Sequence, residues 1–283
     1  MLIGCRATPS VMSMPCCEYD IIVLSIDGGH PNQVLKLDSH YAELIRVPMG
    51  PAVRRTFLSN FEVIILNDTD DLKLSSIKNT DISNRERMIN MSATARRLLI
   101  SCLLRNDDID RLSRNSPVIA SMLLKISAYE VIHSLLLFLG LPGSPLHQMD
   151  LLRQILLPSQ SVSDSISLAL EIIGVERATR PVLRRCLPAY SQLALNMYDK
   201  SLIDEKIRHL YESGLTTDCY YYIGRMCSNI LKSRDLNFWH SYSKLIQIGM
   251  DLSLDIERVQ KWNSQLVIIA KTLLRHHRTV IAG

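Results

Sequence analysis

Three acidic side chains near the start of the chain have the types and spacing of a metal-binding set. Glu18 and Asp20 stand two residues apart at the beginning of an apolar, β-branched run, so they share one face of a strand, about 7 Å apart at their roots. Glu43 lies between apolar residues in a later run. Hard divalent cations prefer carboxylate oxygens as ligands. The three residues therefore predict a metal site, and the alternative is that they are solvated acids at strand ends.

A glycine stands at the other end of the loop that leads to these acids. Gly4 and Cys5 close a short apolar strand, and a loop of twelve residues that begins at Arg6 returns the chain to Glu18. The missing side chain of a glycine allows a bulky anion to approach the backbone closely. We therefore expect Gly4, Cys5 and Arg6 to lie where a phosphate group binds.

The first third of the chain must position these residues, and its pattern is mixed α/β. Apolar, β-branched runs bounded by turn signals predict strands. Asp38-Ser39 separates two of the runs and predicts a tight turn between antiparallel strands. A short helix is expected at 51–58 and a turn at Asp27-Gly28-Gly29. The expected strands are Tyr19–Ile26, Gln33–Leu37, His40–Val47 and Phe61–Leu66.

From about residue 83 the apolar residues follow helical spacing. The longest apolar run begins after Ser116-Pro117 and ends at Gly140. Further helices are expected near 91–104, 146–157, 162–173, 178–198, 202–213, 216–232, 236–250 and 254–276. The fold class is therefore α+β, with a small mixed-sheet domain at 1–80 and an all-α helical bundle domain at 81–283. A second, softer boundary is expected at 158–161.

Composition limits the classes of protein. The chain of 283 residues is 47% hydrophobic and 21% charged, with a net charge of +4, which is typical of a globular protein. Seven cysteines without a C-x-x-C pair fit neither a disulfide framework nor a thiolate zinc site, which favours a reducing cytoplasm. The first ten residues lack the pattern of a signal peptide. The run Val118–Leu141 contains Lys125, Glu130 and His133, so we expect a buried core helix rather than a membrane span.

Taken together, the motifs resemble the signature of the DNA polymerase β-like nucleotidyltransferase superfamily, in its small prokaryotic type. That signature is an apolar residue, Gly, then Gly or Ser, a spacer, and an Asp-x-Asp pair leading into a strand, with a third flanked acid on a later strand. Here Ile3-Gly4-Cys5 stands for the first part, Glu18-Tyr19-Asp20 for the pair and Ala42-Glu43-Leu44 for the third. The usual partner of this domain is a helical domain, often of the HEPN type, and the expected helices at 81–283 are similar to such a partner.

The resemblance implies a reaction. The three acids would hold two magnesium ions, and a nucleoside monophosphate would pass from ATP or another nucleoside triphosphate to a hydroxyl group. The acceptor would be a protein side chain, a small molecule or RNA. Gly4 and Cys5 would hold the phosphates through backbone N–H groups, and Arg6 would add charge. Lys125 of the helical domain would reach the triphosphate.

The chain also departs from the signature. Cys5 replaces Ser or Gly, Glu18 replaces Asp, and three residues precede Gly4 where members carry a helix and a full strand. The alternative is a catalytically degenerate member, without a bound metal, that acts as a nucleotide-binding or protein-interaction module. A third hypothesis is a helical interaction protein with a small sheet at its front. The sequence allows a homodimer and indicates no membrane partner.

Other polar motifs predict structural roles. Glu130 and His133 have the i, i+3 spacing of bundle di-iron sites, but a second Glu-x-x-His is absent from the sequence, so we expect a core pair. Arg234–His240 fits the loose Arg-x(4–6)-His pattern of HEPN ribonucleases and is expected to be a chance match. The basic run Arg275–Arg278 predicts a solvated helix surface, with binding of RNA or of a partner's acidic face as the alternative.

Overall fold

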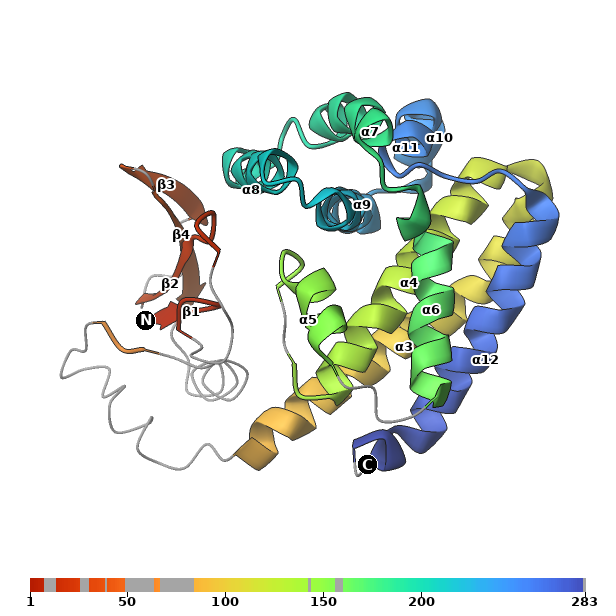
Figure 1. Ribbon diagram of the computed structural model, residues 1–283, viewed down its shortest axis with the longest axis horizontal. Coiled ribbons are helices and arrows are strands. Elements are labelled where there is room, and N and C mark those ends of the chain that lie inside the picture. The colour runs from red at the N-terminus through yellow and green to blue at the C-terminus, as the bar shows by residue number, and fades with distance from the viewer. Residues whose placement is uncertain are drawn as a thin grey trace. The chain divides into compact units, whose positions relative to one another are not determined.

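The computed structural model describes residues 1–7, 14–25, 31–38, 40–48, 64–66, 84–141, 144–155 and 160–281 (Figure 1). The protein is mixed α+β, with a small four-stranded sheet near the N-terminus followed by helices. This coarse architecture was predicted from the sequence. The chain divides into two compact units, each described below by itself.

The sheet has the strand order β1-β2-β4-β3. Its members are β1 (Leu2–Ile3), β2 (Tyr19–Ser25), β3 (Gln33–Leu37) and β4 (His40–Pro48). The pairs β1–β2 and β3–β4 are antiparallel, whereas β2 and β4 are parallel. The predicted antiparallel pair on either side of Asp38 is confirmed, and the backbone φ of Asp38 is 50°, as in a tight turn.

Several predicted elements fall wholly or partly outside the described residues. Of the expected strand Phe61–Leu66, the structure describes 64–66, and Ile64 forms an isolated antiparallel bridge with Leu2. The two backbone hydrogen bonds of this bridge have ordinary N···O distances of 2.8 and 2.9 Å. The turn at 27–29, the helix at 51–58 and the first half of the expected boundary at 158–161 lie outside the described residues. Residues 160 and 161 belong to α6 (Gln160–Ile173).

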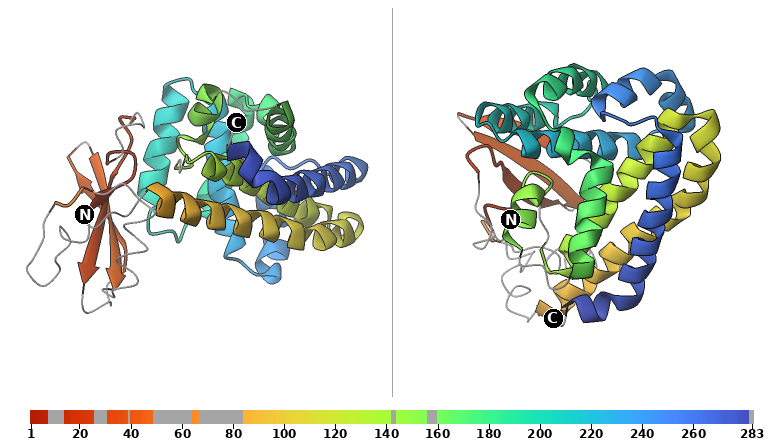
Figure 2. Two further views of the ribbon diagram at one scale, coloured as in Figure 1. Left: turned by 90° about the horizontal axis from the view of Figure 1, so that it is seen from below. Right: turned by 45° about the vertical axis from the view of Figure 1, so that its right-hand side comes forward.

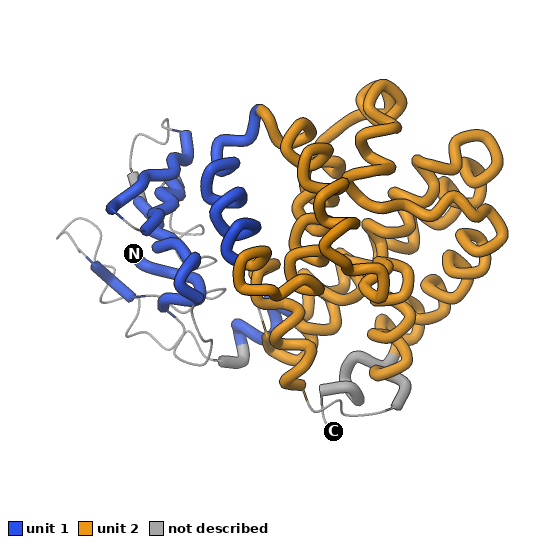
Figure 3. Tube along the Cα trace, turned by 45° about the horizontal axis from the view of Figure 1, so that its top comes forward, with its two compact units in different colours: residues 1–91, 196–209 blue, residues 92–195, 210–283 orange. Residues whose placement is uncertain are grey.

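Unit 1 combines Met1–Met91 with a distant segment, Asn196–His209 (Figure 3). The sheet contributes buried side chains such as Ile3, Ile22 and Ala42 to its core. The distant segment contributes Leu202, Ile203 and Ile207, all buried. The sequence placed 196–209 in the helical domain, whereas the structure groups it with the sheet.

Unit 2 consists of Ser92–Leu195 and Leu210–Gly283 and is helical. The helices of the described residues, over both units, are α3 (Asn84–Asn115), α4 (Pro117–Phe138), α5 (Gln148–Gln154), α6 (Gln160–Ile173), α7 (Arg180–Leu193), α8 (Lys200–Glu212), α9 (Thr216–Lys232), α10 (Leu236–Ser241), α11 (Ser243–Gly249) and α12 (Ile256–Ile281), with a 3-10 turn at Val175–Arg177. Most of α8 belongs to unit 1. At the centre of unit 2, α4 packs against α6, α12, α9 and α11, and the right-hand view of Figure 2 shows α4, α6 and α12 side by side. Helix α3 is joined to α4 by hydrogen bonds from Arg105 to Ser127 and from Ser134 to the Ala95 carbonyl.

The predicted helices are confirmed apart from their ends and one break. The expected single helix at 236–250 is wrong, because the chain forms α10 and α11, which meet at Tyr242. The expected helix at 178–198 is shorter, since α7 begins after the capping residue Thr179 and ends at Leu193. The difference in α7 lies at the helix ends, which short-range periodicity defines poorly, whereas the break at Tyr242 divides a predicted helix.

Helix α4 is long and apolar enough to cross a membrane by length and composition. Almost all of its residues are buried inside unit 2, as in a core helix. The predicted role of this run as a core helix is therefore confirmed.

Candidate functional site

The structure brings Glu18, Asp20 and Glu43 together in unit 1, and we call them the carboxylate cluster. One carboxylate oxygen from each lies within 4.8 Å of the other two. Strand alternation puts Glu18 and Asp20 on one face. The parallel register of β2 and β4 then sets Asp20 directly beside Glu43. Glu18 directly before β2, Asp20 on β2 and Glu43 on β4 thus bring three carboxyl groups together.

Gly4 lies directly against the cluster. Its backbone φ of +77° is in the left-handed region, and a Cβ atom built there would be 2.0 Å from Oδ2 of Asp20. The absent side chain therefore makes room for the Asp20 carboxyl group. Any side chain at residue 4 would displace one member of the cluster.

A Gly4→Ala variant is expected to lose about 2–4 kcal/mol of unfolding free energy, from the left-handed backbone and from the clash with Asp20. Gly214→Ala is the matched control, since its φ is +74° and a Cβ atom there would meet nothing within 4 Å. The control is expected to lose only the backbone part, about 1–2 kcal/mol. Urea unfolding measures both. Equal losses in the two variants would contradict the close approach of Asp20 to Gly4.

The distant segment of unit 1 supplies two direct partners of the cluster. Lys206 on α8 forms an ion pair with Glu18, with Nζ 2.6 Å from Oε1, and the two side chains are only 9% and 12% exposed. The Tyr198 hydroxyl donates a hydrogen bond to Oε1 of Glu43 at 2.5 Å. Glu18 and Glu43 are therefore each held by a residue more than 150 positions away along the chain.

The acids of the cluster differ in how readily they ionise. Burial and the neighbouring charge of Glu18 raise the pKa of Asp20 to about 8. Burial also raises the pKa of Glu43, although the hydrogen bond from Tyr198 opposes it. Burial disfavours the charged form of Glu18 as well, but Lys206 outweighs it, so the pKa of Glu18 lies below its usual value. Near neutral pH, Glu18 thus keeps the charge while Asp20 keeps a proton, and the two share a hydrogen bond.

The charges around the cluster do not balance when every acid is ionised. Three carboxylates and the Lys206 ammonium leave two negative charges. Asp199 of the same segment adds a further acid, and burial raises its pKa. An excess of negative charge in a partly buried place favours either a proton or a bound cation. The arrangement can therefore hold a hard divalent cation in exchange for the proton on Asp20.

Two residues for which the sequence predicts phosphate binding have hydrogen-bond partners within their own unit. Lys125 is buried in unit 2, where its ammonium group donates to the Met250 carbonyl at 2.5 Å and to the Tyr220 hydroxyl at 3.1 Å. Arg6 donates from Nε and Nη2 to the Cys17 carbonyl, at 2.9 and 2.6 Å, and stacks on the ring of Tyr19. Lys125 is thus held by two acceptors of unit 2, and Arg6 holds the loop that precedes Glu18.

The other polar motifs behave as structural elements. Glu130 is buried and pairs with both Arg105 and Lys232, through separate carboxylate oxygens. His133 contacts Arg225, and burial together with the Arg225 charge lowers its pKa to about 3. The two residues therefore belong to a packed polar network of unit 2. The side chains of 276–278 in the basic run lie outside the described residues.

Sequence reasoning missed Lys206 and Tyr198. Lys206 lies on the buried face of a short amphipathic helix. A single lysine in such a helix does not indicate which acid it pairs with, so the pair with Glu18 could not be predicted. Tyr198 stands just before that helix and is 54% exposed. Only the grouping of 196–209 with the sheet reveals both residues as part of the site.

Comparison with known proteins assigns the chain to no class. No family model matches it, and neither the curated proteins nor the solved structures contain a match. The function must therefore be proposed from the geometry of the cluster and from the resemblance of its motifs.

Proposed function

We propose that the protein binds a divalent cation at the carboxylate cluster and uses it to transfer a nucleoside monophosphate from a nucleoside triphosphate to a hydroxyl group. The single observation that carries the proposal is the convergence of Glu18, Asp20 and Glu43, with oxygens within 4.8 Å of one another. Asp20 on β2, Glu43 on β4 and Glu18 directly before β2 offer three oxygen donors suited to a hard cation such as magnesium.

The residues present fit such a cation in both chemistry and charge. All three donors are carboxylates, and burial together with the charge of Glu18 raises the pKa of Asp20 although Lys206 opposes the shift. One divalent cation neutralises the two charges left by the three carboxylates and Lys206. A second cation would accompany the triphosphate, which brings its own negative charge. When bound, magnesium would lower the pKa of the acceptor hydroxyl and neutralise the departing pyrophosphate.

The chain's own residues support the metal in defined ways. Lys206 keeps Glu18 ionised, and the Tyr198 hydroxyl fixes the orientation of the Glu43 carboxylate. Gly4 leaves room for Asp20 at the meeting point of β1 and β2. The resemblance to polymerase β-like nucleotidyltransferases implies that a nucleoside triphosphate binds here, with its phosphates held by the backbone N–H groups of Gly4 and Cys5. ATP is the first triphosphate to test, and the acceptor is a protein side chain, a small molecule or RNA. The absence of a C-x-x-C pair favours action in a reducing cytoplasm.

A second candidate function is a non-catalytic one, and the Lys206 ion pair favours it. An ammonium group on Glu18 and a proton on Asp20 already offset two of the three charges of the cluster. Because the Lys206 ammonium group can stabilise the cluster without a metal ion, the fold can persist in a protein that no longer catalyses nucleotidyl transfer. In that case the protein is a nucleotide-binding or protein-interaction module.

Transfer of label from α-labelled ATP tests the proposed activity. With magnesium present, the wild type is expected to label an acceptor, and Glu43→Gln is expected to label it at least about 100-fold more slowly, because even the loss of an outer partner of a metal ligand costs about 10–100-fold. The Gln side chain keeps an oxygen acceptor for Tyr198 but loses the charge. Glu205→Gln is the matched control, since Glu205 pairs with Arg208 at the surface of the same unit.

Calorimetric titration with magnesium and ATP separates the two candidates. Binding without transfer of label would select the non-catalytic module. A folded protein that binds neither magnesium nor ATP would rule out both candidates and leave a helical interaction protein.

A further inference from the structure

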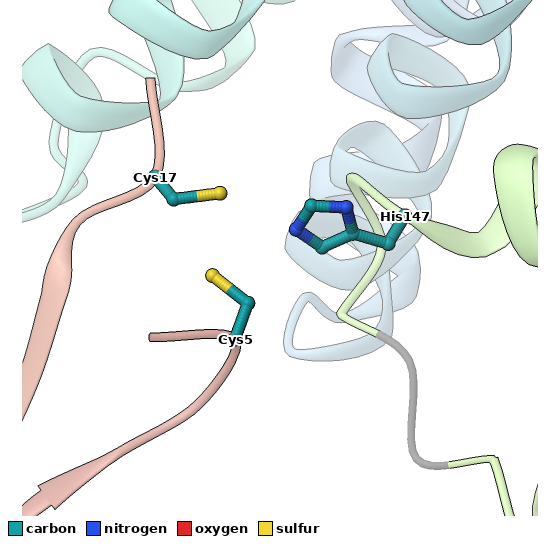
Figure 4. Close-up of side chains that lie close together, drawn as sticks. All are labelled: Cys5, Cys17 and His147. Carbon is teal, nitrogen blue, oxygen red and sulfur yellow. The ribbon is translucent and has the colours of Figure 1, made fainter. Parts of the chain in front are cut away.

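Two cysteine side chains face each other beside the carboxylate cluster. The Sγ atoms of Cys5 and Cys17 lie within 4.8 Å of one another in unit 1, and Cys5 is hydrogen-bonded to Cys17 (Figure 4). His147, drawn in the same figure, is a buried residue of unit 2. The pairing of the two cysteines could not be expected from the sequence, because they stand twelve positions apart without a known motif.

Backbone contacts hold the two cysteines in place. Arg6 donates two hydrogen bonds to the Cys17 carbonyl, so the residue next to Cys5 is fastened to Cys17 itself. The Met14 amide donates to Sγ of Cys17 at 3.2 Å, and the Ala7 amide donates to the Gly4 carbonyl at 3.1 Å. The thiols are therefore held near one another by the fold.

We propose that Cys5 and Cys17 form a reversible disulfide in the presence of a small-molecule disulfide of the glutathione class. Cys5 is partly exposed, whereas Cys17 is only 2% exposed, so Cys5 reacts first. The Cys5 thiolate attacks the small disulfide and releases one thiolate, which leaves a mixed disulfide on Cys5. The Cys17 thiolate then attacks Sγ of Cys5 and releases the second thiolate. The two cysteines lose two electrons and two protons, and the small disulfide is reduced to two thiols.

The disulfide would act on the carboxylate cluster through the chain. Cys5 directly follows Gly4, which lies against Asp20, and Cys17 directly precedes Glu18. A disulfide brings its sulfur atoms to about 2.05 Å, which is closer than two thiols in contact. The segments that carry Gly4 and Glu18 must shift with them. We infer that formation of the disulfide changes the affinity of the cluster for magnesium, an inference that rests on the proposed cation site.

Peptide mapping of the full chain tests the disulfide itself. Glutathione disulfide is added at mildly alkaline pH, and trypsin cleaves after Arg6, which places Cys5 and Cys17 on separate peptides. The expected product is a linked pair of peptides that dithiothreitol separates. Cys16 shares a peptide with Cys17, so Cys16→Ser is the matched control and is expected to keep the link. Cys17→Ser is expected to abolish it.

Mapping of the wild type does not depend on how the variants fold. Failure of the wild type to form the linked peptides, or a link in Cys17→Ser that equals that of the wild type, would overturn the disulfide. Magnesium titration of the oxidised and reduced chains then tests the coupling, with a several-fold difference in Kd expected. Equal Kd values would overturn the coupling, whereas absence of magnesium binding in both forms would count against the cation site and leave the mapped disulfide standing.

Discussion

A Lys206→Met variant is expected to be less stable than the wild type by about 3–5 kcal/mol near neutral pH, because it leaves the buried Glu18 carboxylate without its counter-ion. The ammonium group lies 2.6 Å from Oε1 of Glu18, and both side chains are almost fully buried. Methionine keeps much of the length of the lysine stem, so the loss reports mainly on the charge. Urea unfolding at several pH values measures it.

The pH dependence of this loss has a definite sign. Lys206 lowers the pKa of Glu18 below its usual value, so the ion pair stabilises the fold above the usual pKa and stops doing so as the pH falls through the lowered one. The difference between wild type and variant is therefore expected to be largest at neutral pH and to shrink in acid. A constant difference across this range would indicate lost packing rather than a lost ion pair.

Two further variants isolate the ion pair. Glu18→Gln combined with Lys206→Met removes both charges and is expected to recover most of the stability. Lys200→Met is the matched control, since Lys200 pairs with Asp204 on the same helix with side chains 23% and 45% exposed. Its loss is expected to stay within about 1 kcal/mol. A Lys206→Met variant that loses no more than the control would contradict the buried pair.

The half of the site that is local along the chain could be predicted from the sequence. Alternation along a strand fixes that Glu18 and Asp20 share a face, and the flanking apolar residues place Glu43 on another strand. The parallel register of β2 and β4 decides that Asp20 stands beside Glu43. The register depends on which strands pair in the sheet, and no local sequence pattern reveals that order. The sequence could therefore predict a third acid on a neighbouring strand, but not that this acid stands beside Asp20.

The other half of the site comes from a distant segment, and here local reasoning fails for a physical reason. Periodicity shows that the helix at 200–212 has a buried face, but not which surface covers that face. Lys206 and Tyr198 are therefore indistinguishable, in sequence, from any lysine or tyrosine of an amphipathic helix. The case of Lys125 is the converse: a lysine in an apolar helix suggested a ligand, whereas its acceptors are the Met250 carbonyl and the Tyr220 hydroxyl.

The second large effect concerns Asp20 and the pH dependence of cation binding. Because the pKa of Asp20 is raised to about 8, a divalent cation must displace a proton when it binds near neutral pH. The affinity of the wild type for magnesium is therefore expected to rise about tenfold per pH unit from pH 6 to pH 8 and to level off above that. Burial raises this pKa most, the charges of Glu18 and Glu43 raise it further, and Lys206 opposes them.

Asp20→Asn is expected to abolish this dependence. Asparagine keeps the shape of the protonated acid but holds no titrating proton, so magnesium binding becomes weak at every pH. Without metal, the free energy of unfolding of the wild type is expected to fall with pH, whereas its magnesium affinity rises. The folded pKa of Asp20 lies above its unfolded value, so the wild type loses stability as the pH rises from about 4 to 8, whereas the variant does not. At pH 8 and without metal, the variant is expected to be more stable than the wild type by about 2 kcal/mol or more.

Calorimetry in two buffers of different ionisation enthalpy measures the proton released on magnesium binding. Near pH 7 the wild type is expected to release close to one proton per cation, and Asp20→Asn none. Asp38→Asn, at an exposed turn of the same sheet, is the matched control and is expected to behave as the wild type does. Magnesium binding without proton release in the wild type would show that the cation binds elsewhere. Between pH 6 and pH 8, magnesium binding by the wild type is expected to strengthen while its stability without metal falls. The loss of one proton from Asp20 accounts for both changes. A solvated acid at a strand end would account for neither.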